Sequence, residues 1–205
     1  PGAIIPVFGV HPWWVDEQGE APSLAAVQRL SAYLDRGAGL GELGLDFGRR
    51  TRPESRPLQT LIFGQQLELA RAFRKPLVLH VVQAHDEALA ILRSFAPLEG
   101  GGIVHSFSAS RTVARAYLEL GLSISLGSAI ARKGFERLKE AVVSLPLDHV
   151  VLETDAPGQL NEPESLWDVA EAVASLRNLK ADEVLKQSRA NLIRIFKLTL
   201  PEFSR

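Results

Sequence analysis

Histidine and carboxylate residues stand at or near the carboxyl ends of several apolar runs in this sequence. Glu42 lies in GLGELGLD, His80 in PLVLHV, His105 in GGIVHSF and Asp155 in HVVLETD. A carboxylate buried in a strand is costly unless a cation or strong donors compensate it. Imidazoles and carboxylates both bind divalent metals, and the strand ends offer no matching set of arginines. The pattern therefore predicts that these four residues gather around a metal ion.

Asp46 lies further along the segment that carries Glu42. Two interpretations stay open for it: Asp46 orients a metal ligand, or it caps the loop that follows the strand.

The elements that position these residues are strands alternating with helices. The runs are continuously apolar, which is typical of parallel strands buried on both faces. The expected strands are Ile5–Val10, Gly39–Asp46, Pro76–Val81, Gly101–Phe107, Leu122–Ser128 and His149–Asp155. Apolar stripes with helical spacing lie between and after them, and Ser23 and Ser110 are the expected N-caps of two helices. The chain is therefore expected to be an α/β protein with a parallel sheet.

A TIM-like (β/α)8 barrel explains the polar residues better than an open doubly wound sheet. In a barrel the carboxyl ends of all strands meet at one mouth, whereas in an open sheet they spread along an edge. No GxGxxG or GxxxxGK[ST] motif follows any strand. Six strands are two fewer than a barrel needs, so we expect two β/α units, roughly 50–60 residues, to be lacking before Pro1. Residues 1–205 would form a single, N-terminally incomplete hydrolase domain.

Composition narrows the functional classes. The formal net charge of −1 gives no global case for nucleic acid or an anionic membrane. The chain has no cysteine, which excludes thiolate chemistry and fits the cytoplasm, and no apolar run is long enough to span a membrane. Local basic groups follow two of the strands, and they either bind phosphates or are solvated: Arg49, Arg50, Arg52 and Arg56, and Arg132 with Lys133.

Several stretches, in order, resemble the TatD-type metal-dependent deoxyribonucleases. GVHPWW resembles the glycine-x-His-Pro segment of that family, and GELGLDF its glutamate motif. QQLELARAFRKPLVLHVVQAHDEAL and GGIVHSFSAS resemble the segments with its first and second histidines. LPLDHVVLETDAP resembles its aspartate strand, and NEPESL and ANLIRIF its closing helices. The resemblance spans nearly the whole chain.

This resemblance implies a TIM-like barrel that hydrolyses phosphodiester bonds in DNA with one or two divalent metal ions, among which magnesium, manganese, zinc and nickel stay open. Glu42, His80 and His105 would be metal ligands, with Glu42 bridging where two metals bind. Asp155 would be a ligand or the general base, which makes Asp155 and Glu42 the catalytic carboxylates. His11 would contact a substrate phosphate.

The sequence departs from the family pattern in three places. The opening His-x-His strand is absent, Val82 stands where relatives usually have arginine, and the stretch from Asp155 to Asn161 is short. Two alternatives therefore stay open. One is a metal hydrolase for amides, lactones or phosphotriesters, although no lysine takes the bridging position. The other is a non-catalytic barrel that has lost full metal binding.

Overall fold

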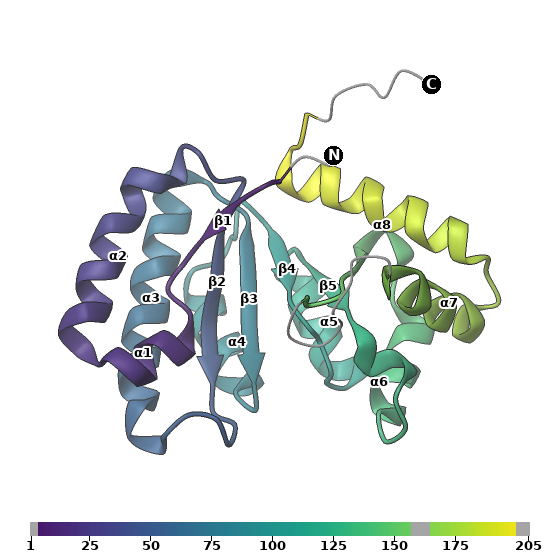
Figure 1. Cartoon of the computed structure of the whole chain (residues 1–205), viewed down its shortest axis with the longest axis horizontal. Coiled ribbons are helices and arrows are strands. Elements are labelled where there is room, and N and C mark those ends of the chain that lie inside the picture. The colour runs from purple at the N-terminus through teal and green to yellow at the C-terminus, as the bar shows by residue number, and fades with distance from the viewer. Residues whose placement is uncertain (1–3, 157–164, 200–205) are drawn as a thin grey trace. The chain divides into compact units, whose positions relative to one another are not determined.

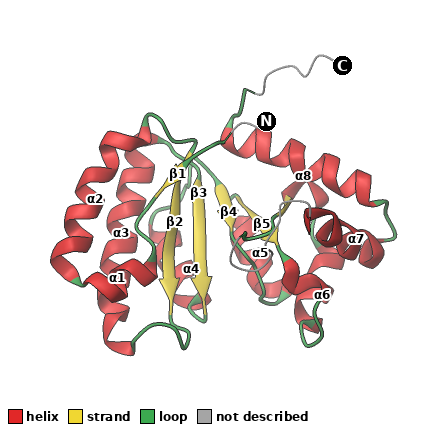
Figure 2. Ribbon diagram, viewed as in Figure 1, coloured by secondary structure: helices red, strands yellow, loops and turns green. Residues whose placement is uncertain are grey.

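Strands and helices alternate along the chain in the computed structural model, which describes residues 4–156 and 165–199 (Figure 2). The chain forms two compact units. The first runs up to His105 and also includes Arg115–Ser123; the second comprises Ser106–Ala114 and the chain from Ile124 onward. Helix α5 (Arg111–Glu119) and strand β5 (Leu122–Leu126) contribute residues to both units.

The first unit contains four parallel strands in chain order, as the continuous apolar runs predict. They are β1 (Val7–Phe8), β2 (Gly39–Asp46), β3 (Leu77–Val82) and β4 (Gly102–Val104). The bounds of β2 match the expected strand. β1 and β4 are much shorter than Ile5–Val10 and Gly101–Phe107, because the chain turns away from the ladder. Beyond β4, for example, Ser106 has a φ of 45°.

Four helices belong to the first unit: α1 (Pro12–Gln18), α2 (Glu20–Leu34), α3 (Arg56–Phe73) and α4 (His85–Ser94). Helices α2 and α3 lie side by side in Figure 1. An apolar cluster joins them to the end of β1 and to α1, with Val10, Val15, Val27, Leu30 and Ile62 at its centre. These contacts fix the segment that carries His11 against α3.

The prediction that Ser23 caps a helix is wrong. Gly19, with a φ of 76°, ends α1 and lets α2 begin immediately at Glu20. Ser23 therefore lies inside the first turn of α2, where its hydroxyl donates to the carbonyl of Gly19 at 2.6 Å.

Strand β2 contains an irregularity at Glu42. Gly41 pairs with Val78 and Leu43 with Leu79, so Glu42 has no partner on β3. A bulge of this kind redirects a side chain that a regular strand would point into the core. Every other residue of β2 is buried, whereas Glu42 is half-buried. The bulge explains how a core strand presents a carboxylate.

The second unit joins β5 and β6 (Val150–Leu152) as a parallel pair, with α6 (Glu136–Ser144), α7 (Leu166–Arg177) and α8 (Ala181–Phe196). Helix α8 holds the backbone around β6. The amide of Leu152 donates to Ser188 Oγ at 2.9 Å, and Asn191 Nδ2 donates to the carbonyls of Leu147 and Val150 at 2.8 and 2.7 Å. These contacts position the segment that leads to Asp155.

Two expectations fall wholly or partly outside the described residues: the short connection from Asp155 to Asn161, and most of NEPESL. Within the described ranges, no helix has the length and apolar character that crossing a membrane requires.

The close approach of β2 to β3 yields a stability prediction. Gly44 has a φ of 142°, and a Cβ there would collide with the carbonyl of His80. We expect Gly44→Ala to lower the free energy of unfolding by about 1–3 kcal/mol or more. Gly64 in α3 has open space where a Cβ would lie, so Gly64→Ala should raise that free energy by about 0.5–1 kcal/mol. Urea unfolding of both variants measures their free energies of unfolding. Equal unfolding midpoints for the two variants would contradict the close approach of Gly44 to the carbonyl of His80.

Candidate metal centre

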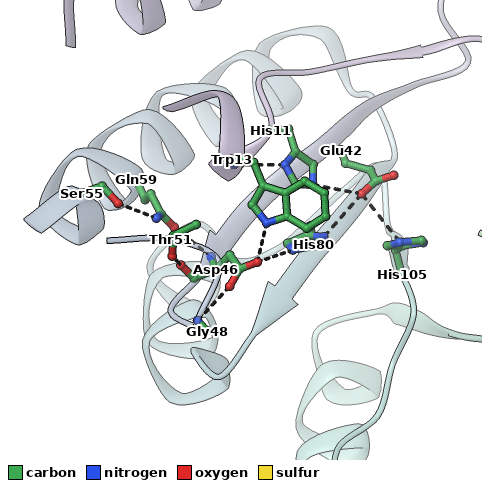
Figure 3. A network of polar contacts seen from close by, with 10 residues as sticks. All are labelled: His11, Trp13, Glu42, Asp46, Gly48, Thr51, Ser55, Gln59, His80 and His105. Carbon is green, nitrogen blue, oxygen red and sulfur yellow. Dashed lines mark hydrogen bonds and ion pairs between the residues drawn. The ribbon is translucent and has the colours of Figure 1, made fainter. Parts of the chain in front are cut away.

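The carboxylate of Glu42 faces three imidazole rings of the first unit (Figure 3). Its Oε2 lies 3.4 Å from His11 Nε2, 3.5 Å from His80 Nδ1 and 3.7 Å from His105 Nε2. The four residues come from the start of α1, from β2 and β3, and from the end of β4. The structure thus brings together three of the four predicted ligands, and it adds His11 to them.

Glu42 carries a negative charge in this setting. Burial raises the pKa of its carboxyl, but hydrogen bonds from His11 and His80 and the charge of His105 outweigh burial. The pKa of Glu42 therefore lies well below its ordinary value. An ionised carboxylate among three imidazole rings offers the donor types of a divalent metal site.

His80 bridges two carboxylates. Its Nδ1 faces Glu42, while its Nε2 lies 3.2 Å from Asp46 Oδ2. Burial lowers the pKa of His80, but the hydrogen bonds and charges of Asp46 and Glu42 outweigh burial and raise it above the ordinary value. The ring is therefore fixed at both nitrogens.

The contacts of Asp46 fit both interpretations that the sequence left open. Its Oδ2 contacts His80 and accepts the indole N–H of Trp13 at 2.6 Å, and its Oδ1 accepts the amide N–H of Gly48 at 2.8 Å. It orients a histidine and also caps the loop after β2. Burial raises the pKa of Asp46, yet these hydrogen bonds, with His80 first, bring it below the ordinary value.

His11 is held differently. It is the N-cap of α1, and its Nδ1 accepts the backbone N–H of Trp13 at 3.1 Å. An accepting Nδ1 carries no proton, so in the neutral ring the proton is on Nε2 and points to Glu42. This arrangement makes His11 a hydrogen-bond donor toward the site, whereas a metal ligand would need a lone pair on Nε2.

Two buried glutamines of α3 support the site, and neither was recognised in the sequence. Gln66 binds the backbone of Val10 twice, accepting its N–H at 2.7 Å and donating to its carbonyl at 3.0 Å. Gln59 accepts the backbone N–H of Asp46 at 2.8 Å and donates to Ser55 Oγ at 2.9 Å. Their spacing of seven residues on the buried face of a helix was the available signal, because a buried amide needs partners.

The second unit contains Asp155 and Glu153. Asp155 follows β6, is half-buried and has a φ of 54°. Its role as ligand or general base stays a prediction. Glu153, not singled out in the sequence, accepts the backbone N–H of Ser106 at 2.7 Å and the hydroxyl of Ser125. Since Ser106 directly follows His105, Glu153 fixes the turn through which the chain leaves that histidine.

The arginines after β2 have different environments. Arg52 binds the carboxylate and backbone carbonyl of Asp16, so its guanidinium ties the loop to α1. Arg50 Cζ lies over the ring of Trp13, 3.6 Å from its centre, and Arg56 Cζ lies 4.9 Å from the ring centre of Phe47. Arg50 thus makes the closer of these two cation–π contacts.

The donor atoms fit a metal ion. Ligands bound to tetrahedral zinc at about 2.0–2.1 Å lie roughly 3.3–3.4 Å from one another. The separations of 3.5 and 3.7 Å from Glu42 Oε2 to the nitrogens of His80 and His105 exceed this spacing by only a few tenths of an ångström, but His105 does not belong to the group of described residues whose ligand atoms all lie within 4.8 Å of one another. Its ring must therefore move toward that of His80 for both to bind one metal ion. By distance alone, His11, Glu42 and His80 form a group with ligand atoms within 4.8 Å of one another. The hydrogen bonding of His11 argues that it is the donor in this group.

A family model described as TatD related DNase matches residues 1–197. This chain belongs to the TatD family. It is 36% identical over 214 residues to the 3'-5' ssDNA/RNA exonuclease TatD of Erwinia billingiae, covering 97% of this chain and 79% of that protein. It is 32% identical over 196 residues to the uncharacterized metal-dependent hydrolase YcfH of Escherichia coli, covering 92% and 72%.

The solved structure of YjjV, a TatD homologue from Escherichia coli, superposes with a TM-score of 0.85 at 27% identity, covering 95% of this chain and 77% of that one. The resemblance to the TatD family and the expectation of an α/β fold of the TIM-like barrel class are therefore confirmed. Relatives in this family are named metal-dependent hydrolases, which agrees with a carboxylate–histidine cluster that fits a metal.

The attachment of the His11 segment to α3 provides a second prediction. Gln66→Leu leaves the buried N–H and carbonyl of Val10 without their glutamine partner, so the free energy of unfolding should fall by about 1–3 kcal/mol. The matched control is Gln65→Leu, because Gln65 is the half-buried neighbour on the same helix. Urea unfolding followed by circular dichroism compares them. If both variants unfold at the same urea concentration, Gln66 does not secure this segment.

Proposed function

We propose that this chain is a metal-dependent phosphodiesterase that hydrolyses DNA, with metal held by Glu42, His80 and His105 and with Asp155 as further ligand or general base. The observation that carries the proposal is the ionised Glu42 carboxylate within 3.7 Å of three imidazole nitrogens. The exonuclease name of the Erwinia billingiae relative, at 36% identity, supports a nucleic acid substrate.

A divalent metal, when bound, supplies a water molecule with a lowered pKa and positive charge beside the phosphate. The residues of the chain do the rest. Asp155 accepts a proton from the attacking water. The water oxygen forms a bond to phosphorus, the P–O bond to the leaving nucleotide breaks, and the departing oxygen takes up a proton.

His11 and Arg50 are the proposed contacts to the phosphate. The Nε2–H of His11 points to Glu42 in the cluster, and in the proposed complex it donates to a phosphate oxygen in place of Glu42. Arg50 adds a fixed positive charge next to Trp13, whose ring centre lies 4.7 Å from that of His11. A chain with a net charge of −1 binds DNA through such local groups.

The metal assignment is tested with Glu42→Gln. An amide cannot supply the negative charge of the carboxylate. Loss of a residue that only supports a metal ligand lowers metal affinity by up to about 100-fold. Loss of a ligand itself should cost at least as much, so we expect zinc and manganese affinity to fall at least about 100-fold. Nucleotide release from end-labelled single-stranded DNA should fall with it. The control is Glu68→Gln, because Glu68 is an exposed carboxylate of α3 that forms its ion pair with Arg71.

Each result of this test separates the candidate functions. Wild-type protein that binds metal but cleaves neither DNA nor RNA would indicate a hydrolase for amides, lactones or phosphotriesters. Wild-type protein that binds no metal would indicate a non-catalytic barrel.

The phosphate contact is tested with Arg50→Gln. We expect a higher KM for single-stranded DNA, a kcat near the wild-type value, and a salt dependence of binding that is reduced by about one phosphate contact. The control is Arg29→Gln, because Arg29 is exposed on α2. Steady-state kinetics at several salt concentrations measure these quantities. Identical KM values and salt slopes for Arg50→Gln and wild type would remove Arg50 from the substrate site.

A further inference from the structure

The contact between Asp46 and His80 determines which nitrogen of His80 carries a proton. Asp46 has 3% of its side chain exposed, and its Oδ2 lies 3.2 Å from His80 Nε2. An ionised carboxylate only accepts hydrogen bonds, so Nε2 must carry a proton. The second contact to Oδ2, from the indole N–H of Trp13 at 2.6 Å, prevents the carboxylate from turning away.

The consequence appears at the other nitrogen. With one ring proton held on Nε2, the proton on Nδ1, which faces the Glu42 carboxylate at 3.5 Å, is the one that a bound metal displaces. The metal then takes the place of this proton as the positive charge between the ring and Glu42. Asp46 therefore creates a place for a cation between His80 and Glu42, although it lies on the far side of the ring.

We propose that Asp46 is a positioning residue that retains the Nε2 proton of His80 and so presents Nδ1 to the metal. Trp13 holds Asp46 in place for this task. The inference rests on the proposed function for the presence of the metal, but the protonation state of Nε2 is independent of it. Carboxylate partners of this kind orient metal-binding histidines and raise their basicity.

His11 provides an internal comparison. Its outer nitrogen, Nδ1, receives a backbone N–H, whereas the outer nitrogen of His80 gives its proton to a carboxylate. The two rings lie 4.4 Å apart, centre to centre, and both face Glu42. The partner on the far side of each ring therefore assigns one histidine as a donor and the other as a ligand.

The test uses Asp46→Asn, which keeps the shape of the side chain and removes its charge. Zinc affinity, measured by competition with a chelator, should fall about 10–100-fold. In NMR spectra of the metal-free wild-type chain labelled with 15N-histidine, the Nε2-bound proton of His80 should resonate far downfield and exchange slowly. In Asp46→Asn this resonance should move upfield or vanish. The control is Asp16→Asn, because Asp16 is another buried carboxylate of this unit, 8% exposed against 2% for Asp46, but binds Arg52.

The outcomes are separable from those of the proposed function. If Asp46→Asn binds zinc as tightly as the wild-type chain, this inference is overturned and the metal assignment stands. The same conclusion follows if the spectrum of the wild-type chain shows no proton on His80 Nε2. If the Nε2 proton is present but the wild-type chain binds no zinc, the proposed function is overturned, and with it the presentation of Nδ1 to a metal. The wild-type spectrum needs no variant, so misfolding of Asp46→Asn does not remove the test.

Discussion

The negative charge of Glu42 is the constraint on which the rest of the first unit depends. A bulge in β2 directs this carboxylate out of a strand whose other residues are buried. Burial alone would raise the pKa of Glu42, so the charge persists only because polarised N–H groups and positive charge surround it. The ends of β1, β3 and β4 each bring a histidine to this carboxylate. Because the strands are parallel, three histidines that are far apart in the sequence can compensate the charge of Glu42.

Supporting residues, more than distances, distinguish the roles of these histidines. His11 and His80 lie at nearly equal distances from Glu42, 3.4 and 3.5 Å. Their outer nitrogens have opposite partners, an N–H for His11 and a carboxylate for His80. Helix α3 supports both arrangements, since Gln66 holds the backbone before His11 and Gln59 holds the backbone of Asp46. One buried helix face therefore supports the segments of both His11, the proposed donor, and His80, the proposed ligand.

The parallel α/β fold, the family and the proximity of Glu42, His80 and His105 could all be predicted from the sequence. Continuous apolar runs with polar ends are typical of parallel strands whose carboxyl ends meet. The sequence was insufficient for the contacts of side chains with the backbone. The helical spacing distinguishes the buried Gln66 from Gln65, but only packing against the β1–α1 connection makes Val10 its partner. The prediction that Ser23 is an N-cap is wrong for a related reason. The positive φ of Gly19 lets the helix begin at Glu20, and this backbone angle could not be read from the sequence. The role of Asp155 stays a prediction.

The side chains proposed to bind metal lie on strands, and the one proposed to bind phosphate lies on a loop. This division agrees with how precisely each side chain must be positioned. Metal ligands must be held within a few tenths of an ångström. The proposed ligands Glu42 and His80 lie on strands that are close because Gly44 has no side chain opposite His80. A phosphate contact tolerates more freedom, and Arg50 lies on the loop after β2. Trp13 connects the two regions. Its indole N–H secures Asp46 behind His80, while its ring face carries the guanidinium of Arg50. A change in Trp13 would therefore act on Asp46 and on Arg50 together, which makes this tryptophan the link between the proposed metal site and the proposed phosphate contact.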